Sequence, residues 1–426
     1  MKICLPYGKE MISVNVCDNN LKGVLTSNIN DYKPRIDYTE IVKSAMQNPI
    51  GTEKLEILAK DKQKVCIIAS DHTRPVPSKI IMPLMLGEIR KGNPNADITI
   101  LIATGLHRTT TKQELVSKFG EEIVENEKIV IHDCDDTENL VNLGALPSGG
   151  RLIVNKIAVD ADLLVAEGFI EPHFFAGFSG GRKSVLPGVC ARETVMFNHN
   201  ASFIDNKNAR TGVLRDNPVH NDMIYACKKA KLAYIVNVVI NAEHQPIFAV
   251  AGDAEKAHLK GVEFLNDKCR VKASVSDVVI STNGGYPLDQ NVYQAVKGMT
   301  SAEATVKKGG VIIMVAKASD GHGGENFYKT FKNCESVEEL MNKFLATPPL
   351  ETVIDQWQSQ ILARVMLKAT VIMVTSADKK IIEDMKMRYA KTVDEALKMA
   401  KEILGKEDYT LTVIPDGVSV IVEEDE

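Results

Sequence analysis

The alternation of apolar runs with helical segments is the feature that most constrains the fold of this 426-residue chain. Residues 64–70 (KVCIIAS) and 96–104 (ADITILIAT) have the length and composition of buried strands, and residues 78–90 between them carry apolar side chains at helical spacing. Residues 128–134 (KIVIHDC) predict a third strand. Strands that alternate with helices are typical of a parallel sheet covered by helices. We therefore expect an α/β fold with mainly parallel sheets.

A second α/β alternation begins at residues 276–282 (SDVVIST), after a polar and basic stretch. A chain of this length exceeds what one hydrophobic core usually supports. We therefore predict two α/β domains, an N-terminal domain over 1–270 and a C-terminal domain over 271–408. Residues 409–426 predict a β-hairpin that can pack on either domain, the N-terminal one included.

The net charge and the cysteine pattern exclude several classes of function. A net charge of -5 does not suit a nucleic-acid partner, which usually requires a basic surface. No apolar run approaches the ~20 residues that span a bilayer, and the first ten residues lack the apolar core of a signal peptide. The eight cysteines form no C-x-x-C pair, which favours reduced thiols. We expect a cytoplasmic protein that binds neither nucleic acid nor membranes.

Two polar loops directly follow the first two predicted strands. Asp71-His72-Thr73-Arg74 comes after residues 64–70, and the sequence GLHR, which contains His107, comes after residues 96–104. Loops at the carboxyl ends of parallel strands lie at one edge of the sheet and commonly bind ligands there. Arg74 has a guanidinium fork suited to a carboxylate or a phosphate, and Asp71 can orient a base or bind hydroxyl groups. A capping aspartate and a surface arginine are an equally good interpretation of this loop.

A glycine-rich loop with His173, Lys183 and His199 follows another apolar run, 161–169. Glycine allows the backbone to approach a ligand closely. The sequence around Lys183 resembles a phosphate-binding loop, but Arg182 stands where that motif requires glycine. A lysine in such a loop can instead anchor a cofactor covalently.

The histidines of these loops allow two kinds of chemistry. His107, His173 and His199 together can ligate a metal, although their spacing fits no compact zinc motif, and two of them can equally act as an acid–base pair. We interpret the remaining candidates as incidental, because they lie in ordinary helix and strand patterns: His220, His244 and His258.

Two further candidates lie in the second alternation. Tyr293 and Lys297 are four residues apart on a predicted helix and share one face of it. Lys297 can neutralise an anion, or it can be a solvated lysine above a half-buried tyrosine. Trp357 is either a core residue or the wall of a pocket.

Taken together, these segments resemble the nickel-dependent lactate racemase family. The resemblance is carried by DHTRP at 71–75, GLHR at 105–108, EPHFFAGFSGGRKSVLPG at 171–188, NHN at 198–200, YQAVKG at 293–298 and DQWQ at 355–358. Each motif is weak alone, but their order and spacing hold along essentially the whole chain.

The resemblance implies an active site in the cleft between the two domains, with the nickel-pincer nucleotide as cofactor. This group is a pyridinium-3-thioamide-5-thiocarboxylic acid mononucleotide that holds Ni(II). The implied roles are catalysis by His107 and His173, nickel ligation by His199, covalent attachment through Lys183, support of the cofactor by Asp71, Gly180 and Gly181, and substrate binding by Arg74, Tyr293, Gln294, Lys297 and Trp357.

The implied reaction is the racemisation of a 2-hydroxy acid, with lactate as the default. One histidine takes the hydroxyl proton while hydride moves from Cα to the cofactor, and a planar 2-oxo acid results. Hydride returned to the other face gives the opposite enantiomer, so each substrate orientation needs its own base. Cofactor-biosynthesis proteins are implied partners. The alternatives are another 2-hydroxy acid, such as malate or one with a larger side chain, a phosphate-loop nucleotidase, and a non-catalytic nickel or nucleotide carrier.

Overall fold

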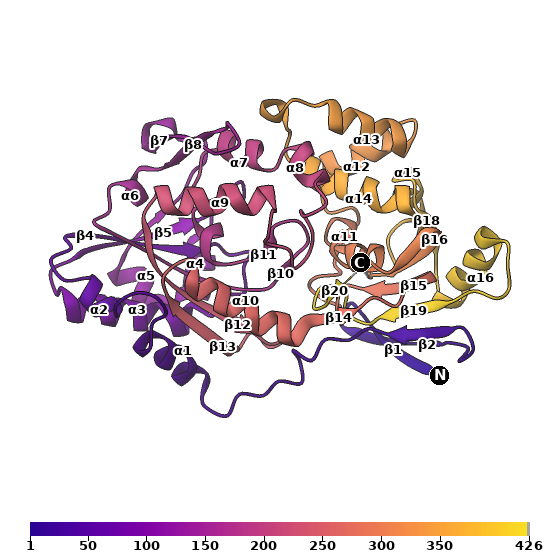
Figure 1. Cartoon of the computed structure of the whole chain (residues 1–426), viewed down its shortest axis with the longest axis horizontal. Helices are drawn as coiled ribbons and strands as arrows, with labels where there is room; N and C mark the ends of the chain where they lie inside the picture. Colours follow the sequence, from indigo (N-terminus) through magenta and orange to yellow (C-terminus); the bar gives the residue numbers. More distant parts are fainter. Residues whose placement is uncertain (424–426) are drawn as a thin grey trace. The chain divides into compact units, whose positions relative to one another are not determined.

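The computed structural model describes residues 1–423, and the chain falls into two compact units. We call Ile29–His199 together with Asn208–Asp267 the N-terminal unit. The C-terminal unit comprises Met1–Asn28, Asn200–Lys207 and Lys268–Glu426. Each unit contains one six-stranded sheet, and Figure 1 labels several strands of each.

The sheet of the N-terminal unit has the strand order β13-β12-β9-β4-β5-β6. Its strands are β4 (Lys64–Ser70), β5 (Asp97–Ala103), β6 (Lys128–Ile131), β9 (Leu163–Phe169), β12 (Leu232–Ile240) and β13 (Pro246–Gly252). All pairs are parallel except the edge pair β12 and β13. The three strands expected from the first apolar runs are therefore present as β4, β5 and β6.

Helices cover both faces of this sheet because its strands are apolar throughout. Val65, Ile67 and Ala69 of β4 belong to a core cluster with helices α1 to α5, while Cys66 and Ile68, which alternate with them, are also buried. Figure 1 shows α1 to α3 on one side of the sheet and α9 on the other. The helices of this unit are α1 (Tyr38–Gln47), α2 (Leu55–Leu58), α3 (Ser78–Gly92), α4 (Lys112–Phe119), α5 (Glu121–Asn126), α6 (Lys156–Val159), α7 (Arg192–Asn198), α9 (Pro218–Lys229) and α10 (Lys256–Cys269), with short 3₁₀ turns η1 (Thr137–Asn139) and η2 (Gly181–Ser184).

The strand order reverses between β4 and β9. From β4 the chain moves through α3 to β5 and then to β6, whereas β9 lies on the other side of β4 and is followed outward by β12. In open α/β sheets, ligands bind in the crevice outside the carboxyl ends of the strands at such a reversal. The loop with Asp71 follows β4 and the glycine-rich loop follows β9, so both loops lie at this reversal of strand order.

Two small antiparallel pairs complete the unit: β7 (Leu140–Ala145) with β8 (Arg151–Asn155), and β10 (Pro172–His173) with β11 (Gly177–Phe178).

The C-terminal unit contains a parallel sheet in the order β18-β17-β16-β15-β19-β3. Its strands are β3 (Leu21–Val24), β15 (Ser276–Thr282), β16 (Val306–Val315), β17 (Ala369–Val374), β18 (Arg388–Ala390) and β19 (Leu411–Ile414). Its helices are α8 (Ala201–Asp205), α11 (Val292–Glu303), α12 (Glu325–Lys332), α13 (Val337–Ala346), α14 (Gln356–Lys368), α15 (Lys379–Asp384) and α16 (Val393–Leu404), with the 3₁₀ turn η3 (Pro349–Glu351). Both sheets agree with the predicted α/β class, and mainly parallel pairing is confirmed.

The prediction that residues 1–270 form one domain differs from the observed division. Strand β3 pairs with β19, and the hairpin of β1 (Lys2–Tyr7) and β2 (Glu10–Asn15) contributes Ile3, Leu5 and Val14 to the core of the C-terminal unit. Apolar periodicity reports that a strand is half-buried but not which sheet it joins, so the first residues were assigned by their position in the sequence alone.

The predicted hairpin over 409–426 is wrong for the described part of that segment. Strand β19 pairs in parallel with β15 and β3, whereas β20 (Ile421–Glu423) pairs in parallel with β14 (Arg270–Lys272). Two apolar runs around Pro415-Asp416-Gly417 have the pattern of a hairpin. In the structure, however, each run pairs with a strand that is distant in the sequence. Residues 424–426 lie outside the described residues.

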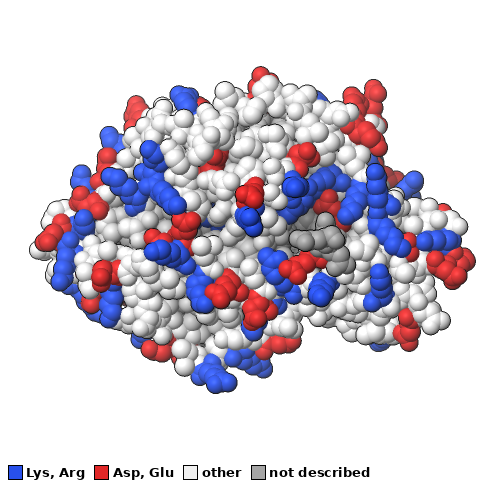
Figure 2. All heavy atoms as spheres, in the orientation of Figure 1, with Lys and Arg blue, Asp and Glu red and all other residues white. Residues whose placement is uncertain are grey.

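The surface carries charges of both signs. On the face drawn in Figure 2, lysine and arginine side chains alternate with aspartate and glutamate rather than forming one basic patch. Across residues 1–423, no helix is both long and apolar enough to cross a membrane.

Candidate active site

Asp71 and His107 form a hydrogen-bonded pair at the carboxyl ends of β4 and β5. Asp71 is 1% exposed, and its Oδ2 lies 2.7 Å from Nδ1 of His107. Its Oδ1 accepts hydrogen bonds from the backbone N–H of Thr73 at 3.1 Å and from the Thr73 hydroxyl at 2.6 Å. Burial alone raises the pKa of Asp71, but the hydrogen bonds from His107 and Thr73 and the charge of Arg74 lower it below its usual value on balance. Asp71 is therefore ionised at neutral pH.

The ionised carboxylate determines the tautomer of His107. Because it can only accept, Nδ1 of His107 carries the proton, and the lone pair of the neutral ring lies on Nε2. The His107 side chain is 43% exposed, so this ring is open to a ligand. The arrangement is that of a base oriented by a buried carboxylate.

Arg74 is exposed in the same loop, and half-buried Lys118 and buried Ser78 and Glu167 lie near it. Nζ of Lys118 donates to the Arg74 carbonyl at 3.1 Å, and the Ser78 hydroxyl donates to Glu167 at 2.6 Å. Burial raises the pKa of Glu167, although the nearby charge of Lys118 opposes this, and burial lowers the pKa of Lys118. The sequence analysis missed both residues. A glutamate inside the apolar run of β9 was the available signal, because a fully buried carboxyl group needs a specific partner.

The glycine-rich loop brings His173 and Lys183 together. Nζ of Lys183 lies 3.2 Å from Nε2 of His173 and 5.6 Å from the centre of the Phe175 ring. His173 itself contacts Phe175 edge-to-face, with ring centres 4.6 Å apart. These two predicted residues, ten positions apart in the sequence, are direct neighbours because strands β10 and β11 fold the loop back on itself.

His199 lies at the end of α7 and also contacts Phe175. It is 5% exposed, and its ring centre is 5.2 Å from that of Phe175. Burial and the positive charge of Lys183 lower the pKa of His199 to about 3, so the ring is neutral. Nδ1 lies 3.0 Å from the Val195 carbonyl oxygen, which can only accept. The lone pair is therefore on Nε2, the state that a metal ligand requires.

Gly180 and Gly181 lie where side chains do not fit. Gly180 has φ +76°, and a Cβ there would lie 2.7 Å from Oδ1 of Asn237. Gly181 has φ +51°, and a Cβ there would lie 2.8 Å from the His258 ring. The two glycines allow the turn before Lys183 to pack closely against β12 and α10.

The loops after β5 and β9 contact each other directly. The backbone N–H of Gly105, which has φ +54°, donates to the Gly188 carbonyl at 3.0 Å. The structure therefore gathers the predicted residues of the N-terminal unit at the reversal of strand order: Asp71, Arg74, His107, His173, Gly180, Gly181, Lys183 and His199.

The other predicted substrate-binding residues lie in the C-terminal unit and are half-buried: Tyr293, Gln294 and Lys297 on α11, and Trp357 on α14. The Tyr293 hydroxyl donates to Asp355 at 2.8 Å, and the Gln358 side chain donates to the Tyr293 carbonyl. These bonds connect α11 to the start of α14, where Trp357 lies.

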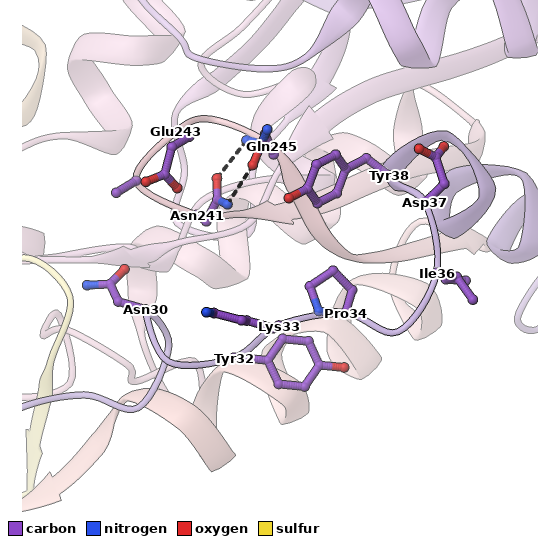
Figure 3. A pocket seen from close by; sticks show the side chains of 11 residues that line it. Asn30, Tyr32, Lys33, Pro34, Ile36, Asp37, Tyr38, Asn241, Glu243 and Gln245 are labelled. Carbon is purple, nitrogen blue, oxygen red and sulfur yellow. Dashed lines mark hydrogen bonds between the residues drawn. The ribbon is translucent and has the colours of Figure 1, made fainter.

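A pocket of about 480 Å³ lies elsewhere in the N-terminal unit, between the chain before α1 and the turn from β12 to β13 (Figure 3). It is lined by Asn30, Tyr32, Lys33, Pro34, Ile36, Asp37, Tyr38, Asn241, Ala242, Glu243 and Gln245. Asn241 and Gln245 bond to each other there, and no predicted site residue lines the pocket. We therefore do not assign it to the reaction.

His220 and His258, which the sequence patterns indicate to be incidental, lie against a buried side chain. Both contact the buried guanidinium of Arg182, at 3.1 Å and 3.0 Å respectively. Arg182 entered the sequence analysis only as a residue that excludes a phosphate loop, because spacing alone does not reveal that its side chain points inward.

Sequence profiles of two domains match the chain: the lactate racemase N-terminal domain over residues 7–212 and the lactate racemase C-terminal domain over residues 271–422. The chain is 55% identical to the lactate racemase of Thermoanaerobacterium thermosaccharolyticum over 421 residues, with 99% of both chains covered. It is 51% identical to the lactate racemase of Lactiplantibacillus plantarum over 422 residues, again with 99% of both covered.

Solved structures give the same grouping. The lactate racemase apoprotein from Thermoanaerobacterium thermosaccharolyticum matches with a TM-score of 0.96 at 54% identity, over 100% of both chains. A protein from Thermotoga maritima matches with a TM-score of 0.63 at 20% identity, over 92% of this chain and 100% of its own, and indicates a shared fold alone. From these matches and the site geometry, the chain belongs to the lactate racemase family and is an isomerase of the racemase class.

Proposed function

We propose that this protein interconverts the two enantiomers of lactate by hydride transfer with a lysine-anchored nickel-pincer nucleotide. The observation that carries the proposal is the pair of histidines on loops at the reversal of strand order, one oriented by Asp71 and the other adjacent to Lys183. Similarity to two lactate racemases supports lactate as the substrate.

The donor set of the glycine-rich loop fits such a cofactor. His199 is neutral, with the lone pair of its ring on Nε2, and Lys183 and His199 contact the same Phe175 ring. Lys183 would anchor the group covalently, His199 would ligate the nickel, and Asp71, Gly180 and Gly181 would support it. When bound, the cofactor supplies an acceptor for hydride, which no protein side chain can provide.

The side chains of the protein supply binding and proton transfer. Arg74, in the exposed loop after Asp71, would bind the substrate carboxylate through its guanidinium fork. His107 would take the hydroxyl proton at Nε2, and His173 would be the base for the opposite enantiomer. The ionised Asp71 would stabilise the imidazolium form of His107 after each transfer. Tyr293, Gln294, Lys297 and Trp357 are the remaining candidates for substrate binding.

Attachment of the proposed cofactor to Lys183 would require the proteins that synthesise it. We infer that cofactor-biosynthesis proteins are the physiological partners and that loading takes place in the cytoplasm. All eight cysteines are free thiols in the structure, which suits a reducing compartment.

The test compares the protein produced with and without those biosynthesis proteins. Only the former is expected to carry a mass adduct on Lys183 and to convert L-lactate to D-lactate in a chiral assay. His107→Ala and His173→Ala should retain the adduct and lose activity by about 10²-fold or more. An unmodified Lys183 in a fully active protein would overturn the anchoring proposal, and full activity in either histidine variant would overturn the two-base mechanism.

Parallel assays with malate and with a larger 2-hydroxy acid test the substrate. If either reacts with a higher kcat/KM than lactate does, lactate is not the preferred substrate although the mechanism stands.

A further inference from the structure

Arg182 is the largest fully buried side chain of the described residues, and it precedes Lys183 in the chain. A guanidinium in the interior is costly unless its donors are satisfied. Within residues 1–423, no carboxylate forms a salt bridge with it, so neutral acceptors must satisfy it. Burial lowers the pKa of Arg182 to about 9, and the group therefore remains charged at neutral pH.

The acceptors of Arg182 are carbonyl groups of its own loop. Nη2 donates to the Ala176 carbonyl at 2.8 Å, and Nη1 donates to the carbonyls of Ser179 and Gly180 at 3.3 Å each. The Gly180 carbonyl also accepts from the backbone N–H of Lys183 at 3.1 Å. One rigid guanidinium therefore spans the turn that leads to Lys183 and holds its carbonyl groups in fixed directions.

Two histidines from separate helices contact Arg182, and one of them accepts a hydrogen bond from the guanidinium. Nε of Arg182 donates to Nδ1 of His220 on α9 at 3.1 Å. Nε2 of His258 on α10 lies 2.8 Å from the Ser179 carbonyl oxygen and 3.0 Å from Nη1 of Arg182. Since the carbonyl can only accept, the neutral His258 ring carries its proton on Nε2 and donates to it, so Nε2 does not also accept from Arg182. His258 and Arg182 therefore both donate to the Ser179 carbonyl. Burial and the charge of Arg182 lower the pKa of both histidines, so both rings remain neutral acceptors or donors.

The turn is also fixed from the sheet. Oδ1 of Asn237 on β12 accepts from the backbone N–H of Gly181 at 2.7 Å. Arg182 points into the interior, whereas the half-buried Lys183 points the other way, toward His173.

We propose that Arg182 is a positioning residue, which together with His220 and His258 braces the turn at 176–181 so that Lys183 faces the position of cofactor attachment. The inference rests on the proposed function of Lys183 as the anchor. Arg182, His220 and His258 would then position the turn without taking part in the reaction.

The experiment uses Arg182→Lys, which keeps the positive charge but presents one ammonium in place of the fork. In the full-length apoprotein, hydrogen–deuterium exchange should show backbone protection over residues 176–185 falling by about tenfold, while β4 and β12 keep theirs. When the protein is produced with the biosynthesis proteins, the rate of adduct formation on Lys183 should fall by about tenfold or more, and the KM of the loaded fraction should not change. Arg90→Lys, which alters an exposed arginine paired with Glu127, is the matched control and should change neither quantity.

His220 provides a milder variant in case Arg182→Lys does not fold. His220→Ala should lower local protection and loading in the same direction, and His220→Gln, which restores an acceptor, should recover both. Unchanged protection over 176–185 in Arg182→Lys would overturn the brace, and so would a loss spread evenly over the N-terminal unit. If wild-type protein acquires no adduct, the proposed function fails, and the exchange measurement on the apoprotein still decides whether the brace exists.

Discussion

At the scale of single residues, Asp71 determines what His107 can do. The buried carboxylate fixes the proton on Nδ1, and the 2.7 Å contact leaves the basic lone pair on the exposed side of the ring. A histidine at a loop tip without this partner would rotate and exchange tautomers. The same reasoning applies to His199, whose Nδ1–H donates to the Val195 carbonyl and leaves the lone pair on Nε2.

Asp71→Asn should therefore impair the base without removing it. The amide can donate to Nδ1, which favours the wrong tautomer, and we expect racemisation to fall by about 10²-fold with the protein still folded. A chiral lactate assay and circular dichroism measure the two effects. Asp37→Asn, at the exposed cap of α1, is the control. Activity within twofold of wild type would contradict the assignment of Asp71.

His199→Ala should separate nickel binding from anchoring. The imidazole is the protein's expected nickel ligand, so nickel content per protein should fall by more than about tenfold, while the adduct mass on Lys183 without its metal remains. Elemental analysis and intact mass spectrometry report the two quantities. Full nickel occupancy in this variant would mean that another side chain is the ligand.

At the scale of the elements, strand β15 depends on one carboxylate at its start. Asp277 accepts from the Thr410 backbone at 2.8 Å and its hydroxyl at 2.7 Å, and pairs with Lys307 at 3.0 Å and Lys406 at 2.9 Å. These bonds connect β15 to the starts of β16 and β19. Burial alone raises the pKa of Asp277, but the hydrogen bonds outweigh it and lower the pKa well below its usual value.

Asp277→Asn should weaken the C-terminal unit at neutral pH by about 2 kcal/mol. Because the folded-state pKa is lowered, this contribution is present above the unfolded-state value of about 4 and is lost as the pH falls toward the folded-state value. Urea unfolding at pH 7 and at pH 3 should therefore show a difference from wild type that shrinks in acid. The exposed Asp394→Asn serves as the control. A difference that stays constant with pH would contradict this assignment.

At the scale of the whole molecule, the first 28 residues belong to the C-terminal unit although they open the chain. Strand β3 covers the edge of β19, and Ile3, Leu5, Val14 and Val16 are buried in that unit's core. Each such side chain contributes about 1.5–3 kcal/mol when buried, so together they rival the entire stability of a typical domain.

Deleting residues 1–28 should therefore unfold the C-terminal unit and leave the N-terminal sheet intact. Hydrogen–deuterium exchange should show β15, β16 and β19 unprotected and β4, β5 and β9 protected. Met11→Ala, which truncates a side chain that is 61% exposed on β2, should leave both units protected. Protection of β19 in the deletion variant would show that the segment is dispensable for the unit.

The local elements and the chemical character of the loops could be predicted from the sequence alone. Strands β4, β5 and β15 are continuous apolar runs, and such runs are recognisable without knowledge of their neighbours. The motifs around Asp71, His107, Lys183 and His199 likewise indicated a family and a set of candidate residues.

The pairing of the strands and the contacts between distant side chains became known only from the fold. Pairing of β3 with β19 (Leu21 with Leu411) and of β14 with β20 (Arg270 with Ile421) joins segments far apart in the sequence, and no local pattern encodes such a partner. The inward direction of Arg182 and its contacts with His220 and His258 also follow from packing, because a buried charge is defined by what surrounds it. The order of the strands, not their sequences, brings the loops of β4 and β9 to one place.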